Sequence, residues 1–529
     1  MKILRGGEIQ HRYSFRSYRR WLGGIALAAL TLWFGNVTAV HALTFTPGDL
    51  VVSVEGNGDG SASNGTGATG NTGADAGSYL DNQAAPLTLY EFTTTGSQVG
   101  TLTLPTTSSG NNSAIAGEYG SSSEGTLQLS GNGQYLTIAG YGVNAHDYNS
   151  TYDPNGTGTS LAQSCSLSSG CGGVPQAPRV IATIGSGGRV DSSTALYDVY
   201  NENNPRSVYS TNGKSFYISG QGTGDANDTS GGVFYVPKLG PNQTAIPITG
   251  ADATSSTSSP LDVGQDTRDV QVYNNTLYVS ADTKEGKNSA RDFIGTLGSP
   301  PATSLYDSGN GPTQLNGFGT KTGKYTITTG ANSNGNGPNA GLQINLSPAD
   351  FFFANATTLY VADTGDPKND KADSSLGNGG LQKWSLVNGA WVLDYTLSGG
   401  LSLVDNGNSS GISGLLGLTG KVDGDQVELY ATSYTLSDTD QTYLYAIIDM
   451  LSDTVASQVT SEQFTTLAAA PADTTFKGVC LCAGRHHALA RILAFHAGRP
   501  CGSRLGRHAR RIEAGSLDRR LNGPRGKGG

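Results

Sequence analysis

A short strand motif recurs five times along the chain and restricts its fold more than any other feature. Each copy holds two or three β-branched or aromatic residues followed by a small residue, and the copies span 135–140, 215–220, 276–282, 358–363 and 427–432. A tight polar turn precedes each copy, for example Asn274-Asn275. Asn, Asp and Gly accept the positive φ angles that two-residue hairpins need. The motif therefore predicts the second strand of a repeated β-hairpin.

The spacing of the copies indicates a unit larger than a hairpin. The equivalent positions Leu136, Phe216, Leu277, Leu359 and Leu429 are separated by 80, 61, 82 and 70 residues. Further strand pairs with period-two alternation fill the intervals, at 87–92 with 100–104, 231–236 with 244–248, and 381–386 with 390–397. Each unit is therefore predicted to be a four-stranded sheet with loops of variable length.

A single four-stranded sheet cannot bury both of its faces, so the predicted sheets must pack on one another. Blades arranged around an axis cover these faces and leave only short, protected edges. We therefore expect an all-β fold, a single β-propeller of about six to seven irregular four-stranded blades over residues 43–478. A β-sandwich array or a β-helix is the alternative, although the strict short period of a β-helix is absent.

Two segments carry a resemblance to known repeat proteins. Thr-Leu-Tyr-Val-Ala-Asp at 358–363 resembles the signature strand of NHL and YVTN-type β-propellers, and 379–386 resembles the strand that follows it in those families. The resemblance implies a β-propeller over the body of the chain. The repeats differ from those families in their irregular length, so the number of blades stays open.

The N-terminus has the features of an export signal. A basic region that contains Arg12, Arg16, Arg19 and Arg20 precedes an apolar run at 21–34, and Val40-His41-Ala42 fits a signal-peptidase site. The apolar run is shorter than the roughly 20 residues of a membrane span, which is the alternative. Residues 1–42 are therefore predicted to be a signal peptide, and the protein is expected outside the cell, on its surface or in the periplasm.

Charge is distributed unevenly between the body and the C-terminal tail. Residues 43–479 carry 39 acidic and 16 basic residues, a net charge of −23. Such a body repels phosphate backbones, so nucleic-acid binding is not expected. It suits solubility outside the cell and occasional binding of divalent cations. The protein is expected to be a monomer.

Cysteine is rare in the body and common in the tail. Cys165 and Cys171 are the only cysteines of residues 43–479, and in an oxidising compartment they are expected to close a local disulfide. From Cys480 onward the chain turns basic and rich in His and Cys. A one-base shift of a G/C-rich back-translation gives Ala-Phe-Ala-Pro at this point. Residues 479–529 are therefore predicted to be a disordered, frameshifted tail; a basic metal-binding or nucleic-acid-binding tail is the alternative.

The body lacks the residue patterns of familiar catalytic sites. Its only histidine is His146, and it has no nucleophile elbow, phosphate-binding loop or cysteine-based zinc motif. Four charged residues near the start of predicted inner strands are candidates for lining the axial channel: Arg206, Arg268, Asp269 and Asp350. Charges there would face a ligand or form salt bridges between blades.

Carboxylates supply the single positive signal for a cofactor. Asp363, Asp366 and Asp370 place oxygen ligands in one strand-exit loop, as calcium requires. The alternative is an ordinary solvated turn. The sequence thus favours a secreted or cell-surface propeller that binds a glycan or protein ligand. The alternatives are a calcium-dependent extracellular hydrolase, similar to lactonase or phytase propellers, and the passenger of an autotransporter.

Overall fold

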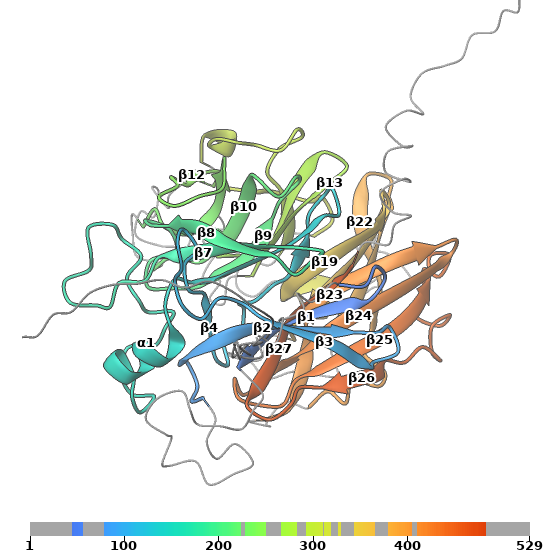
Figure 1. Cartoon of the computed structure of the whole chain (residues 1–529). Helices are drawn as coiled ribbons and strands as arrows, with labels where there is room; N and C mark the ends of the chain where they lie inside the picture. The colour runs from blue at the N-terminus through green and yellow to red at the C-terminus, as the bar shows by residue number, and fades with distance from the viewer. Residues whose placement is uncertain are drawn as a thin grey trace, which may run out of the picture. The chain divides into compact units, whose positions relative to one another are not determined.

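The structure is a computed structural model, and it describes residues 45–56, 79–223, 228–249, 266–282, 293–309, 311–318, 326–328, 343–365, 379–404 and 410–482. Strands dominate these residues (Figure 1). The α-helix among them is α1 (Ala145–Tyr152), which begins where the Asn144 side chain accepts a hydrogen bond from the amide of Asp147. A short 3-10 segment, η1 (Tyr306–Gly309), is the other helical element described.

Four sheets are separate antiparallel blades of four strands, each built from consecutive parts of the chain. Their strands are β9 (Pro205–Tyr209), β10 (Phe216–Gly220), β11 (Gly232–Val236) and β12 (Ile246–Pro247); β13 (Thr267–Tyr273), β14 (Thr276–Ala281), β15 (Phe293–Thr296) and β16 (Thr313–Gln314); β19 (Pro348–Asn355), β20 (Thr358–Asp363), β21 (Gly380–Val387) and β22 (Ala390–Leu397); and β23 (Ile412–Asp423), β24 (Gln426–Thr435), β25 (Tyr443–Met450) and β26 (Thr465–Ala469).

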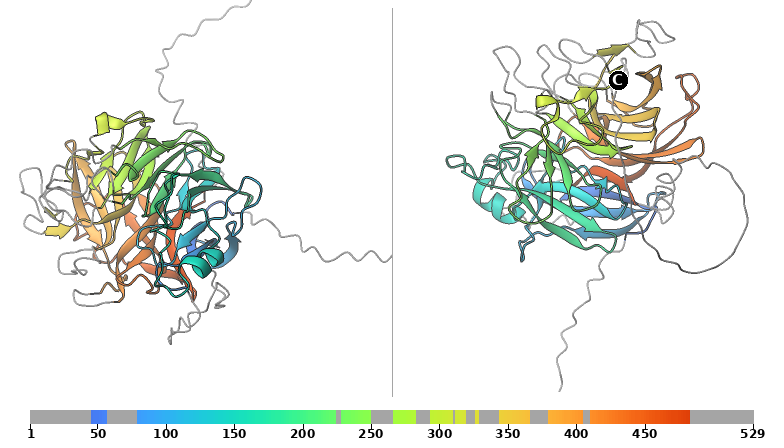
Figure 2. Two further views of the ribbon diagram at one scale, coloured as in Figure 1. Left: turned by 90° about the vertical axis from the view of Figure 1, so that its left-hand side faces the viewer. Right: turned by 90° about the horizontal axis from the view of Figure 1, so that it is seen from above.

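A nine-stranded sheet brings the two ends of the folded chain together. Its strands are β1 (Leu50–Gly56), β2 (Ala84–Phe92), β3 (Gln98–Thr103), β4 (Ala116–Glu118), β5 (Gln128–Leu129), β6 (Tyr135–Tyr141), β7 (Arg179–Gly185), β8 (Val190–Leu196) and β27 (Thr474–Leu481). The C-terminal strand β27 pairs antiparallel with β1, so the red end of the chain lies against the blue end in Figure 2. Strand β4 pairs with both β2 and β6. A separate hairpin consists of β17 (Thr326–Thr328) and β18 (Gln343–Asn345).

Six strands, two from the nine-stranded sheet and the first strand of each four-stranded blade, are neighbours in a closed order, β5–β9–β13–β19–β23–β27 and back to β5. Apolar clusters fill the spaces between adjacent sheets. For example, Tyr209 and Val233 of the β9–β12 blade pack with Val270 and Leu277 of the β13–β16 blade. This arrangement confirms the predicted all-β propeller, in which the core is divided among the blade interfaces.

Hairpin turns fix the register of the first two strands in each blade. Asn274 and Asn275 join β13 to β14 with φ angles of 45° and 59°. Two consecutive residues at positive φ are the requirement of a type I′ turn, which matches the twist of paired strands. The recurrent motif accordingly forms the second strand of its blade in β6, β10, β14, β20 and β24.

The expected domain boundary at residue 478 falls inside a strand. Strand β27 continues to Leu481, and Cys480 and Cys482 are buried in the apolar cluster that also holds Leu87 and Ile138. The described part of the chain therefore continues to Cys482, and β27 pairs along the edge of β1 that β2 leaves free. Residues 1–44 and 483–529, and with them the predicted signal peptide and most of the predicted tail, lie outside the described residues.

Candidate functional site

Long connections gather at one end of the propeller. Neighbouring strands alternate in direction, so the connections from second to third strands and from one blade to the next leave at the same end. The connections from second to third strands span 57–83, 142–178, 221–231, 282–292, 364–379 and 436–442. The connections from one blade to the next include 104–127, 248–266, 315–347 and 398–411. At the opposite end the connections between first and second strands span 130–134, 210–215, 274–275, 356–357 and 424–425. The connections between third and fourth strands lie at that end too and span 93–97, 186–189, 237–245, 297–312, 388–389 and 451–464, so that end has mostly shorter connections. We call the end that holds the connections from second to third strands and between blades the long-loop end.

Arg206 ties two blades together at the long-loop end. Its guanidinium pairs with Asp266 through Nη1 and donates to the Thr267 carbonyl oxygen at 3.1 Å. Nε donates to the Ser123 hydroxyl at 3.0 Å and Nη2 to Gln221 Oε1 at 2.7 Å. Burial lowers the pKa of Arg206, and the Asp266 carboxylate opposes that shift. The side chain is 4% exposed, so these contacts use its donors inside the protein.

Arg268 continues this chain of contacts to the next blade. Its Nη2 lies 3.2 Å from Asp282 Oδ2, and its Nε lies 3.9 Å from Asp266 Oδ1. Asp282 in turn accepts a hydrogen bond of 2.8 Å from the Ser347 hydroxyl. The two arginines predicted to line the channel are therefore joined through Asp266 in an interblade network.

Asp269 and Asp350 meet between three blades. Asp269 accepts from the Ser207 hydroxyl at 2.7 Å and from Gln271 at 3.0 Å, and Asp350 accepts from the Leu418 amide at 2.8 Å. Burial raises the pKa of both carboxyl groups. The Asp269 charge raises the pKa of Asp350 further, whereas hydrogen bonds from Ser207 and Gln271 oppose the shift at Asp269. Both are buried, which makes the pair an internal link rather than a surface acid.

Of the three candidate calcium ligands, Asp363 lies within the described residues. It ends β20, is fully buried, and accepts hydrogen bonds from the Ser347 amide, the Gly365 amide and Gln382 Nε2, each at 2.9 Å. Both oxygens of the Asp363 carboxylate thus accept hydrogen bonds from groups of the protein. Asp366 and Asp370 lie outside the described residues. Within the described ranges, no group of three or more His, Cys, Asp or Glu side chains is arranged to hold a metal ion.

A second carboxylate group, which the sequence analysis missed, lies where the chain closes. We call Glu55, Glu118, Glu124 and Lys477 the closure cluster; all four are buried. Lys477 Nζ lies 3.2 Å from Glu55 Oε2, joining β27 to β1. The Glu118 amide donates to Glu124 Oε2 at 3.2 Å. Gly117 makes room for this arrangement, because a Cβ there would lie 3.0 Å from Glu55 Cγ.

One signal in the sequence identifies Glu55. Val-Ser-Val-Glu at 52–55 matches Val-Ser-Ala-Asp at 279–282 and Val-Ala-Asp at 361–363, so an acidic residue lies within one residue of the end of the strand in each case. Glu118 and Glu124 have no such repeat to mark them.

A small hollow opens beside the closure cluster. Among its lining residues are Ser121, Leu416, Tyr434, Asp438 and Lys477. Its volume of about 20 Å³ is enough for roughly one water molecule.

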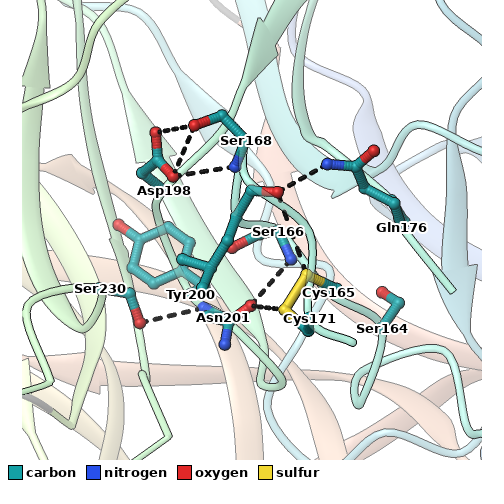
Figure 3. The surroundings of a disulfide bond; sticks show 12 residues. Ser164, Cys165, Ser166, Ser168, Cys171, Gln176, Asp198, Tyr200, Asn201 and Ser230 are labelled. Carbon is teal, nitrogen blue, oxygen red and sulfur yellow. Dashed lines mark hydrogen bonds between the residues drawn. A yellow bond between two sulfur atoms is a disulfide. The ribbon is translucent and has the colours of Figure 1, made fainter. Parts of the chain in front are cut away.

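The longest described connection at this end contains a disulfide (Figure 3). Cys165 and Cys171 are bonded, with a Cα–Cα distance of 5.8 Å. Asn201 lies beside the bond and accepts from the Ser166 amide at 2.9 Å. Arg179, at the start of β7, donates to the carbonyl oxygens of Ser164 and Tyr200 at 2.9 and 2.8 Å. The loop is thus fastened to the neighbouring interblade connection, and the surface it presents is preorganised.

Comparisons with known proteins concern the arrangement of the strands. No protein-family model and no curated protein matches the chain. Similar solved structures include the Hadza microbial sialidase Hz136, at 12% identity and a TM-score of 0.35, over 71% of this chain and 61% of the sialidase. AztD of Citrobacter koseri has 10% identity and a TM-score of 0.24, over 82% of this chain and 97% of its own. A glucose dehydrogenase has 8% identity and a TM-score of 0.29, over 69% and 93%.

Among the described helices, none has the length and apolarity of a membrane-spanning segment. The chain spans about 61% of the length of the sialidase that it matches. Its own strand order, sheet by sheet and closed by β27, makes the protein a β-propeller.

Proposed function

We propose that the protein is an exported β-propeller that binds a glycan or a protein ligand at its long-loop end. The difference in connection length between the two ends of the strands carries this proposal. Binding residues are disproportionately found on loops that a rigid scaffold positions. Here the scaffold is the set of interblade contacts made by Arg206, Arg268, Asp269 and Asp350.

The architecture of the scaffold is proposed to be six-bladed. Four blades are separate sheets, and the nine-stranded sheet supplies two more sets, β27–β1–β2–β3 and β5–β6–β7–β8, bridged by β4. Kinship with NHL and YVTN-type propellers is part of the proposal and rests on the strand at 358–363.

Three features of the chain support export and a place outside the cell. The basic and apolar N-terminal residues have the order of a signal peptide. The Cys165–Cys171 disulfide suits an oxidising compartment. The acidic body suits a soluble monomer that makes no contact with nucleic acid.

Blocking one end of the propeller at a time tests the binding proposal. Thr157 lies in the 142–178 connection and Gln134 in the turn at the opposite end of the same blade; both are exposed. The full chain with Thr157→Cys or Gln134→Cys, each coupled to a bulky polyethylene-glycol maleimide, is applied to an array of immobilised polysaccharides and cell-surface proteins. We expect coupling at position 157 to reduce binding at least about tenfold and coupling at 134 to leave it unchanged. Equal effects at both positions would contradict the proposal.

A calcium-dependent hydrolase is the second candidate function, because the loop with Asp366 and Asp370 leaves β20 at the same end. It predicts that calcium raises the melting temperature of the full chain and releases heat in calorimetry. Asp366→Asn combined with Asp370→Asn would remove both effects, whereas Asp307→Asn, an exposed aspartate at the other end, would not. If calcium neither releases heat nor raises the melting temperature of the unsubstituted chain, the calcium-dependent hydrolase is rejected in favour of a binding protein without a metal.

A further inference from the structure

The pairing of β27 with β1 closes the propeller. Its backbone ladder is interrupted by a bulge, and side-chain contacts join the two strands at that point. Val52 pairs with Val479 and Val54 with Phe476, so Lys477 and Gly478 together face Ser53. A bulge of this kind interrupts the ladder and re-aims a side chain. The Ser53 hydroxyl fills the gap, accepting from the Gly478 amide at 2.8 Å. The bulge lets Lys477 reach Glu55.

The closure cluster joins β27 and β1 to β4, to β6 and to the connections that contain Ala162 and Asn204. Lys477 Nζ donates to the Ser121 carbonyl oxygen and pairs with Glu55 on β1. Glu118 on β4 accepts from the Ala162 amide. Glu124 accepts from the Tyr141 hydroxyl at 2.5 Å and from Asn204 Nδ2. Strands β1, β4, β6 and β27 and the connections that hold Ala162 and Asn204 therefore meet at three carboxyl groups.

Charge in the cluster is unbalanced when all of its carboxyl groups are ionised. The nearby cations are Lys477 on β27 and Arg179 on β7, whose guanidinium lies 4.6 Å from the centre of the Tyr141 ring. Three carboxylates thus face two cations in a buried space. Glu118 also faces Asp81 from the β1–β2 connection and Tyr148 from α1. One bound proton balances the three glutamates against the two cations, and the Asp81 charge further favours the neutral form of Glu118.

Burial is the main reason that the cluster retains a proton. Desolvation raises the pKa of Glu55 from 4.5 to about 8; Lys477 opposes this shift and Glu124 adds to it. Burial and then the Glu124 charge raise the pKa of Glu118 well above its ordinary value. Glu55 Oε1 is buried and accepts no hydrogen bond, as suits a carboxyl group that is not ionised.

We propose that the closure cluster is a pH-sensitive clasp, which holds β27 against β1 and β4 while a carboxyl group is protonated and loosens β27 when that proton is lost. A carboxyl group with a raised folded-state pKa binds more protons in the folded than in the unfolded protein. For Glu55 the stabilisation is fully present below about pH 4.5 and is lost as the pH rises toward 8. The strand that closes the ring is thus the element that alkaline conditions release first.

Hydrogen exchange of the full chain tests the clasp. Amide exchange is measured by mass spectrometry at pH 6 and pH 8.5 and corrected for the intrinsic dependence of exchange on pH. We expect the protection of β27 and β1 to fall by about tenfold per pH unit for each proton lost, while β10 and β11 change little. Parallel changes in both regions of the wild-type chain would overturn the proposal.

A variant separates the clasp from a general effect of pH. Glu118→Gln keeps the size and the carbonyl acceptor of the side chain and removes its ionisation, so β27 should keep its pH 6 protection at pH 8.5. Glu428→Gln is the control, because Glu428 pairs with Lys421 at 2.9 Å on a partly exposed surface. A wild-type pH response in Glu118→Gln would overturn the proposal. If that variant does not fold, Glu55→Gln is measured in the same way, with the same outcome expected.

Discussion

Individual charged residues at the long-loop end each have specific partners inside the protein. Arg206 and Asp266 are both buried, as are Asp269 and Asp350. In water such side chains would each be hydrated, and inside the protein an ion pair and hydrogen bonds replace that hydration. The sequence analysis weighed a ligand-facing role for these charges against salt bridges between blades. In the structure Arg206 pairs with Asp266 beside the next blade, Asp269 accepts from Ser207 of the preceding blade, and Asp350 accepts from Leu418 of the following blade.

Removing one partner of the buried pair should be costly. Arg206→Met leaves the Asp266 carboxylate buried with Arg268 as its nearest cation, 3.9 Å away. We expect the free energy of unfolding to fall by about 3–5 kcal/mol, measured by denaturant titration. Lys421→Met breaks the partly exposed pair with Glu428 and should cost at most about 1 kcal/mol. Equal losses in the two variants would contradict the assignment of Arg206 as an interblade tie.

Whole strands were easier to predict from the sequence than the contacts between them. The motif at 358–363 became β20 because a β-branched and aromatic run after a tight turn favours a paired strand in any surroundings. Helix α1 was not predicted, since its residues have weak apolar periodicity and depend on Asn144 and tertiary packing. Contacts such as Lys383 Nζ to Asp449 Oδ2, 2.9 Å between β21 and β25, join residues of neighbouring blades that no local pattern links.

The domain boundary expected at residue 478 came from composition, and strand β27 runs through it to Leu481. The change to a basic, cysteine-rich composition begins at Cys480, but the alternation needed by a strand continues to Leu481. Cys480 faces one apolar cluster and Leu481 another. The alternative reading frame gives Ala-Phe-Ala at these positions, which preserves the alternation of small and large side chains. Strand β27 is thus compatible with either frame, and the frameshift stays a prediction that sequencing the locus tests.

At the scale of the molecule, the two ends of the folded chain depend on each other. Strand β27 contributes Phe476 and Val479 to the cluster shared with β24 and β25, and Cys480 to the cluster shared with β6 and β7. Without β27, strand β1 would expose an unpaired edge and both clusters would face water. Closure therefore stabilises two blade interfaces together, rather than one sheet alone.

Two truncations test this dependence. A chain that ends at Cys482 keeps β27 and should melt cooperatively at the temperature of the full chain, because residues 483–529 are predicted to add nothing to the fold. A chain that ends at Asp473 loses β27 and should show no cooperative melting transition, and should aggregate through the edge of β1. Calorimetry and size-exclusion chromatography of both chains distinguish the outcomes. A cooperative, monomeric chain ending at Asp473 would mean that the propeller is stable while open, and β27 would then be a removable cover instead of the strand that completes the ring.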